Sequence, residues 1–108
     1  MSSLKNIKSY VRRHHRACQP SSVNHSWVIG LTNDPKRRIG EHKTLIKHEP
    51  RHWRIFVCDS YFDALALEKY FKDIGYNVGT GGTSTDSINL YMYYLPHYKH
   101  LKRKATLQ

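Results

Sequence analysis

Acidic residues are missing from both ends of this chain. Neither residues 1–16 nor the stretch from residue 97 to the C-terminus contains an aspartate or a glutamate. Those two ends carry nine lysines and arginines, namely Lys5, Lys8, Arg12, Arg13, Arg16, Lys99, Lys102, Arg103 and Lys104. The middle of the chain sets nine lysines and arginines against eight acids, so the net charge of +10 comes from the ends. This distribution is typical of a surface that binds a phosphate backbone, although a merely solvated surface has the same pattern.

Cysteine is scarce, with two residues in 108. Cys58 lies in an apolar run, where a small buried side chain is expected. Cys18 follows His14 and His15, with His25 further along, so a zinc site is one alternative. The paired Cys-x-x-Cys spacing of common zinc sites is absent. We therefore expect a reduced, intracellular protein, in the cytoplasm or with the nucleoid or nucleus.

Long apolar runs are also absent. No stretch is long enough to cross a membrane, and the N-terminus has no apolar core of the kind found in signal peptides. A chain of 108 residues is the usual size of one domain, so we expect residues 1–108 to form a single domain with a modest core.

Helical and strand patterns alternate along the chain. The pattern predicts an α+β domain with a basic helix at 1–18, a core at 27–95 and a basic tail at 97–108. Within the core we expect strands at 27–32, 53–58 and 89–95, and helices at 34–48 and 60–74. Residues 77–87 form a predicted loop whose glycines, Gly79, Gly81 and Gly82, suit either a flexible connector or a phosphate cradle.

The predicted first helix is amphipathic. Its polar face carries Lys5, Lys8, Arg12 and Arg16. The opposite face carries Leu4, Ile7, Val11, His14 and Cys18. We interpret the cationic face as a track for a phosphate backbone. A membrane-surface helix fits less well, because the apolar face has no Trp or Phe.

Arg38 and His42 lie four residues apart on the apolar face of the second predicted helix. They share that face with Ile39, Leu45 and Ile46. One interpretation is a snorkelling arginine beside a half-buried histidine. The other is an anion site with the arginine as a two-pronged clamp.

Glu68 lies at the rim of the third predicted helix's apolar stripe. It could form an ion pair with Lys72, four residues further on. Alternatively, it could be an oxygen ligand for Mg²⁺ or a similar cation.

These residues carry a resemblance to a known family. The stretch from Val28 to Lys43, VIGLTNDPKRRIGEHK, resembles the second half of the GIY-YIG endonuclease signature. Val28-Ile29-Gly30 takes the Tyr-Ile-Gly place, and Arg38 and His42 take the arginine and histidine places. In ALALEKYF, Glu68 takes the place of the family's metal-binding glutamate. The resemblance covers roughly residues 27–75.

Two features depart from the family pattern. Val28 replaces a tyrosine, and no Gly-Ile-Tyr strand precedes residue 27. The stretch LYMYYL is similar to the family's first strand, so a circular permutation could have moved that strand to the C-terminus. Tyr93 then takes the Gly-Ile-Tyr tyrosine place, with Tyr91 or Tyr94 as alternatives. Tyrosines of an ordinary core strand would give the same pattern.

The resemblance implies a small three-stranded antiparallel sheet flanked by helices, with the last strand beside Trp27–Thr32. It implies a metal-dependent endonuclease that hydrolyses DNA phosphodiesters with Mg²⁺ or Mn²⁺. The expected catalytic residues are Arg38, His42, Glu68 and Tyr93, with Glu68 as the metal ligand. The expected DNA contacts are Lys5, Lys8, Arg12, Arg16, Lys36 and Arg37. The alternative is an inactive nucleic-acid-binding or protein-inhibitor module on a nuclease-like fold, which the Val28 substitution favours.

Overall fold

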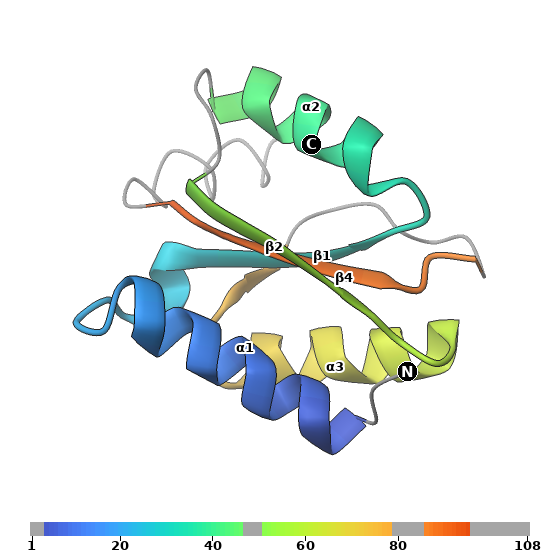
Figure 1. Cartoon of the computed structure of the whole chain (residues 1–108), viewed down its shortest axis with the longest axis horizontal. Coiled ribbons are helices and arrows are strands. Elements are labelled where there is room, and N and C mark those ends of the chain that lie inside the picture. Colours follow the sequence, from blue (N-terminus) through green and yellow to red (C-terminus); the bar gives the residue numbers. More distant parts are fainter. Residues whose placement is uncertain (1–3, 47–50, 79–85, 96–108) are drawn as a thin grey trace.

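A mixed sheet separates two layers of helices in this computed structural model, which describes residues 4–46, 51–78 and 86–95. The elements are α1 (Leu4–Cys18), a short 3₁₀ helix η1 (Asn24–Ser26), β1 (Trp27–Thr32), α2 (Pro35–Ile46), β2 (Arg51–Val57), α3 (Tyr61–Asp73), β3 (Asn77–Val78) and β4 (Asn89–Tyr94). Helices α1 and α3 cover one face of the sheet, and α2 covers the other (Figure 1). The α+β class is therefore as expected.

Strand β4 lies inside the sheet, although it is the last strand of the described residues. The strand order is β2-β4-β1-β3, and β4 runs antiparallel to both of its neighbours. Its register on β1 places Tyr91 opposite Gly30 and Tyr93 opposite Val28. The predicted pairing of the C-terminal strand beside Trp27–Thr32 is confirmed.

The prediction of a three-stranded antiparallel sheet is wrong in its details. A fourth strand, β3, pairs parallel to β1 through Val28 with Asn77 and Ile29 with Val78. Its two residues lie in the stretch that the sequence pattern indicated as loop, because two residues are too few to show a period of two. The side-chain amide of Asn77 donates to the His25 carbonyl at 2.8 Å, which helps to hold this segment against the start of β1.

Alternation along β4 divides its side chains between the two layers. Leu90 and Met92 face α1 and α3, in a core completed by Ile7, Val11, Trp27, Ile29, Leu31, Phe56, Cys58, Ala64, Leu67, Phe71 and Tyr76. Tyr91, Tyr93 and Leu95 face the other way and form a smaller cluster with Val28. The face with fewer apolar side chains is the one that α2 covers.

The ends of the core helices follow the expected capping chemistry. Ser60 Oγ accepts the Asp63 N–H at 3.1 Å at the start of α3, and Gly75 follows the helix with a φ of 106°. Asp34 Oδ1 accepts the Arg37 N–H at 3.1 Å, directly before Pro35 begins α2. Ile74, the C-cap residue, is 38% exposed because it lies beyond the last turn of α3.

No helix within the described ranges combines the length and the hydropathy that a membrane span needs.

Candidate active site

Gly30 leaves room for the ring of Tyr91. The two residues face each other across β1 and β4, and a Cβ atom added to Gly30 would overlap the hydroxyl oxygen and Cζ of Tyr91. Any side chain here would push the tyrosine out of place. The glycine of the Val-Ile-Gly stretch is therefore matched to a tyrosine some sixty residues further along the chain, and the hydroxyl of that tyrosine lies directly over β1.

Arg38 and His42 meet at this tyrosine. Arg38 Nε donates to the Tyr91 hydroxyl at 3.4 Å, and His42 Nε2 lies 2.9 Å from the same oxygen. The other ring nitrogen of His42, Nδ1, lies 2.5 Å from the Tyr93 hydroxyl. Both side chains leave α2 on its sheet-facing side, one turn apart. Their place on an apolar helix face is thus explained by polar partners on β4.

His42 is held neutral by its surroundings. The residue is 4% exposed, and burial, helped by the nearby Arg38 charge, lowers the pKa of His42 to about 4. A neutral imidazole has one donor and one acceptor nitrogen. Since each nitrogen faces a tyrosine hydroxyl, one tyrosine must donate its proton to the ring while the other accepts from it. Arg38, His42, Tyr91 and Tyr93 therefore form one connected hydrogen-bond network.

Tyr91 is better placed for chemistry than Tyr93. Both side chains are fully buried, and burial raises both phenol pKa values, which disfavours the phenolate. At Tyr91 the Arg38 charge and hydrogen bond act against this rise. Tyr94, the third tyrosine considered, packs against Trp27 and His52 on the opposite face. The geometry therefore favours Tyr91 over the Tyr93 of the sequence prediction.

Trp53 is a site neighbour that the sequence reasoning missed. Its ring stacks on Tyr91 with centroids 5.0 Å apart and on Tyr93 with centroids 5.6 Å apart. It was interpreted only as a strand-forming residue. The available signal was its alternation with Ile55, since both lie on the face of β2 that packs against the tyrosine cluster.

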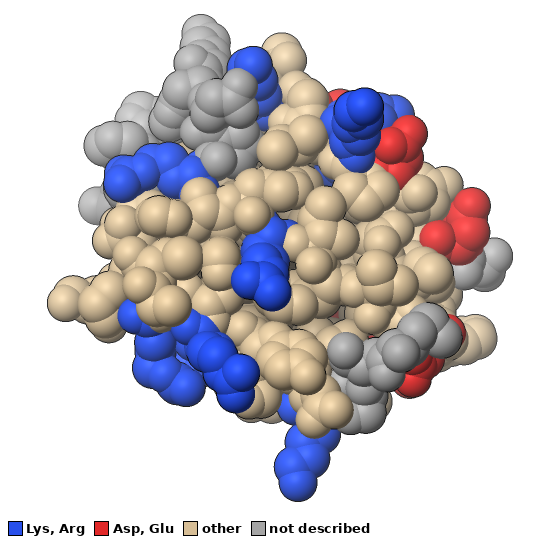
Figure 2. Space-filling view, viewed as in Figure 1, with Lys and Arg blue, Asp and Glu red and all other residues tan. Residues whose placement is uncertain are grey.

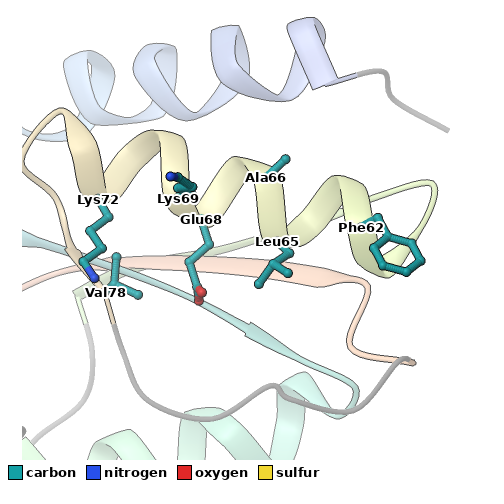
Figure 3. A pocket seen from close by; sticks show the side chains of 7 residues that line it. All are labelled: Phe62, Leu65, Ala66, Glu68, Lys69, Lys72 and Val78. Atoms are coloured by element: carbon teal, nitrogen blue, oxygen red, sulfur yellow. The ribbon is translucent and has the colours of Figure 1, made fainter.

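Glu68 lies in the helical layer on the opposite side of the sheet from Arg38 and His42 (Figure 1). It lies on α3, and its side chain extends away from the helix between those of Leu65 and Lys72 (Figure 3). Its Oε2 atom is buried without a hydrogen-bond partner, and burial raises the pKa of Glu68 to about 7, against the lowering effect of Lys72. The Glu68 charge also acts on Tyr91, where it adds to the rise in the phenol pKa. Glu68 is thus electrostatically coupled to the network, without a described hydrogen bond to it.

The residues fit a metal ion only in part. An orphaned carboxylate oxygen suits a hard cation such as Mg²⁺, which often keeps several of its waters. Within the described ranges no cluster of three or more His, Cys, Asp or Glu side chains is placed to hold a metal. Glu68 would therefore act with water ligands rather than in a protein cage. Of the residues in the zinc alternative, Cys18 Sγ lies 3.6 Å from His14 Nδ1, whereas His15 bonds instead to Tyr76 and Ser22.

The cationic face of α1 is less uniform than the sequence suggested. Lys5 and Arg16 are exposed, and Lys8 Nζ lies 4.1 Å from the centre of the Tyr70 ring. Arg12 turns inward, where Nη1 donates to Asn24 Oδ1 and to the Tyr76 hydroxyl, both at 3.0 Å. Through these two hydrogen bonds Arg12 stabilises the fold. Lysine and arginine side chains gather over α1 at the lower left of Figure 2, whereas acidic side chains lie on the right.

The other expected DNA contacts have different surroundings. Lys36 and Arg37 are exposed at the start of α2, and Arg37 forms ion pairs with Asp34 at 3.9 Å and Glu41 at 3.5 Å. The three glycines of the predicted phosphate cradle and the basic tail at 97–108 lie outside the described residues.

Comparisons with known proteins do not place this chain in a family. Neither a protein-family model, nor a curated protein, nor a solved structure matches it.

Proposed function

We propose that this chain is a metal-dependent endonuclease that hydrolyses phosphodiester bonds in DNA, with a permuted GIY-YIG-like arrangement. The observation that carries the proposal is the meeting of Arg38 and His42 at the Tyr91 hydroxyl, directly over Gly30. An arginine and a histidine from α2 and a tyrosine from β4 converge on one point. Strand β4 delivers the tyrosine from the C-terminal side, as the permuted order requires.

Arg38 has the chemistry to bind the scissile phosphate. Its Nε and Nη1 atoms contact Tyr91 and Glu41, and the remaining N–H donors are available to the non-bridging oxygens. Guanidinium donors fixed in advance stabilise the charge that develops as water attacks phosphorus and the P–O3′ bond breaks. The pairing with Glu41 would hold the guanidinium in place before DNA binds.

Tyr91 and His42 would act on the attacking water. The Tyr91 hydroxyl would accept a hydrogen bond from the water and so orient it. Neutral His42 would accept at Nε2 the proton that Tyr91 passes on. The raised phenol pKa disfavours a resting phenolate, so Tyr91 serves better as an orienting and relaying group than as a free base.

Glu68 would provide the protein ligand for Mg²⁺ or Mn²⁺ through Oε2. When bound, the ion would neutralise charge on the leaving oxygen. The proton and the metal compete for the same carboxylate, whose pKa is about 7. Metal affinity should therefore rise as the pH is raised through neutrality.

The test is incubation of plasmid and single-stranded DNA with purified protein, with and without Mg²⁺ or Mn²⁺. Glu68→Gln should abolish metal-dependent cleavage while DNA binding survives. Arg38→Ala should reduce the rate by about 10²–10³-fold, as removal of other fixed transition-state donors does. Asp73→Asn, which changes an exposed acid on the same helix as Glu68, is the matched control. Undiminished cleavage by Glu68→Gln and Arg38→Ala would contradict the proposed site.

A DNA-binding module without cleavage is the second candidate. Full burial of Tyr91 and Tyr93, together with Val28 in place of a tyrosine, favours it. In this case the wild-type protein binds DNA in a salt-dependent manner and leaves it intact in both metals.

A further inference from the structure

Among the residues that line a hollow beside α3, only Glu68 has a role in the hydrolysis proposed above. It has a volume of about 420 Å³, which is within the usual range for sites that take small molecules. Its lining comes from α3 and β3 and consists of Phe62, Leu65, Ala66, Glu68, Lys69, Lys72 and Val78. Glu68 is the one lining residue that also belongs to the proposed catalytic set.

The hollow combines exposed apolar walls with positive charge. Phe62 is 76% exposed and Leu65 is 41% exposed, one helical turn apart on α3. In Figure 3 Phe62 lies at one end of the row and Val78 at the other, with the side chain of Lys72 reaching towards Val78. Lys69 and Lys72 are both exposed. A ligand that suits these walls has a flat apolar part and an anionic part.

We propose that this hollow is a subsite for one unpaired nucleotide of the DNA next to the scissile phosphate. This inference rests on the proposed function. The base would stack on Phe62 and contact Leu65, while a flanking phosphate would bind Lys69 or Lys72. Glu68 is common to the hollow and to the proposed metal site.

Only an unpaired nucleotide can place its base against Phe62 and Leu65. A base inside a duplex already has both faces stacked and its pairing edge occupied, so it cannot reach a side pocket without leaving the helix. A single strand, a bulge or a frayed end presents its bases at no such cost. The substrate class is therefore DNA with unpaired nucleotides rather than continuous duplex.

The test measures binding rather than cleavage. Fluorescence anisotropy without divalent metal would give the Kd of the full chain for a labelled single strand and for the matching duplex. Phe62→Ala should weaken single-strand binding about ten-fold, the usual effect of losing one stacked base, and leave duplex binding within about two-fold. Leu65→Ala should act in the same direction. Tyr70→Ala is the matched control, because this exposed aromatic on α3 contacts Lys8 and does not line the hollow.

Several outcomes overturn the subsite. The first is that Phe62→Ala loses affinity equally for single strand and duplex, and the second is that it loses affinity for neither. The third is that the wild-type protein does not bind a single strand, as expected if the hollow takes a protein segment. Thermal unfolding of each variant separates a binding defect from misfolding. Glu68-dependent cleavage without any effect of Phe62 would refute only the subsite. Phe62-dependent single-strand binding without cleavage would keep a binding site for an unpaired nucleotide in the hollow, and it would refute both the nuclease and the placement of this site beside a scissile phosphate.

Discussion

A half-buried glutamate and a buried histidine give the candidate site opposite responses to pH. Burial raises the pKa of Glu68 to about 7 and lowers that of His42 to about 4. Both groups are thus held closer to their neutral forms than in an unfolded chain. Folding stability falls as the pH rises if a carboxyl group has a raised pKa, and falls as the pH drops if a histidine has a lowered pKa. The two effects partly cancel in the wild-type protein, so substitutions are needed to reveal them.

Glu68→Gln should stabilise the fold at high pH. In wild type the folded state holds the Glu68 proton up to about pH 7, whereas the ordinary pKa is 4.5, so stability is lost as the pH rises through that window. We expect the variant to gain on the order of 2 kcal/mol at pH 8, after allowance for the solvent that reaches this side chain, and nothing near pH 4. Urea unfolding of both proteins across this pH range measures the difference.

The control for this measurement is Asp73→Asn, which changes an exposed carboxylate on the same helix. Its stability difference from wild type should be small and nearly constant over the same range. A Glu68→Gln protein that is less stable than wild type at pH 8 would mean that the carboxylate makes favourable contacts which its buried, unpartnered Oε2 atom gives no sign of.

At the scale of the element, the cations of α1 have two different roles, proposed contact with DNA and support of the fold, and the sequence alone could not tell which cation has which role. The helical period placed its four cations on one face, which is how they lie on an ideal helix. The long arginine side chain of Arg12 nevertheless bends back to Asn24 and Tyr76, partners that only the tertiary fold brings near. Tyr76 in turn bonds to the buried His15, so this corner of α1 is joined to the end of α3.

This division predicts different effects of equivalent substitutions on α1. Lys5→Ser and Arg16→Ser should each reduce the slope of log K for duplex DNA against log salt by about 0.9, if each contacts one phosphate. Arg12→Ser should leave the slope unchanged and destabilise the fold by about 1–2 kcal/mol, because Tyr76 and Asn24 lose a donor. Salt titrations by anisotropy and urea unfolding give the two readouts. A reduced slope for Arg12→Ser alone would reverse the assignment.

Several elements could be predicted from the sequence because their signals are local. Strand β1 has the bounds expected from its apolar run, and α3 runs from Tyr61, directly after its Ser60 cap, to Asp73, two residues before Gly75. Strand β3 could not be predicted, since it exists only because β1 offers it an unpaired edge. The faces of Tyr91 and Tyr93 followed from alternation, but which hydroxyl meets Arg38 depends on the β1–β4 register and on Gly30. Trp53 could have been found from its alternation with Ile55 on β2.

At the scale of the whole molecule, the sheet depends on a strand from the C-terminal end. Strand β4 pairs with β1 and β2, while β2 and β1 have no described pairing with each other. The two halves of the candidate site, Arg38 with His42 on α2 and Tyr91 on β4, are therefore joined only when this distant strand docks. Contacts so far apart in the chain are slow to form, because a long loop must close first.

This architecture predicts a gradient of hydrogen-exchange protection across the sheet. The β4 amides that bond to β1 and β2 should exchange only by global unfolding, with opening free energies equal to the stability measured by urea. The β3 amides should exchange several orders of magnitude faster, since two residue pairs hold that strand at an edge. Exchange followed by NMR or mass spectrometry would test this order. If β4 exchanged as fast as β3, its docking would be a local and reversible event, and the Arg38–Tyr91 contact would be present in only part of the population.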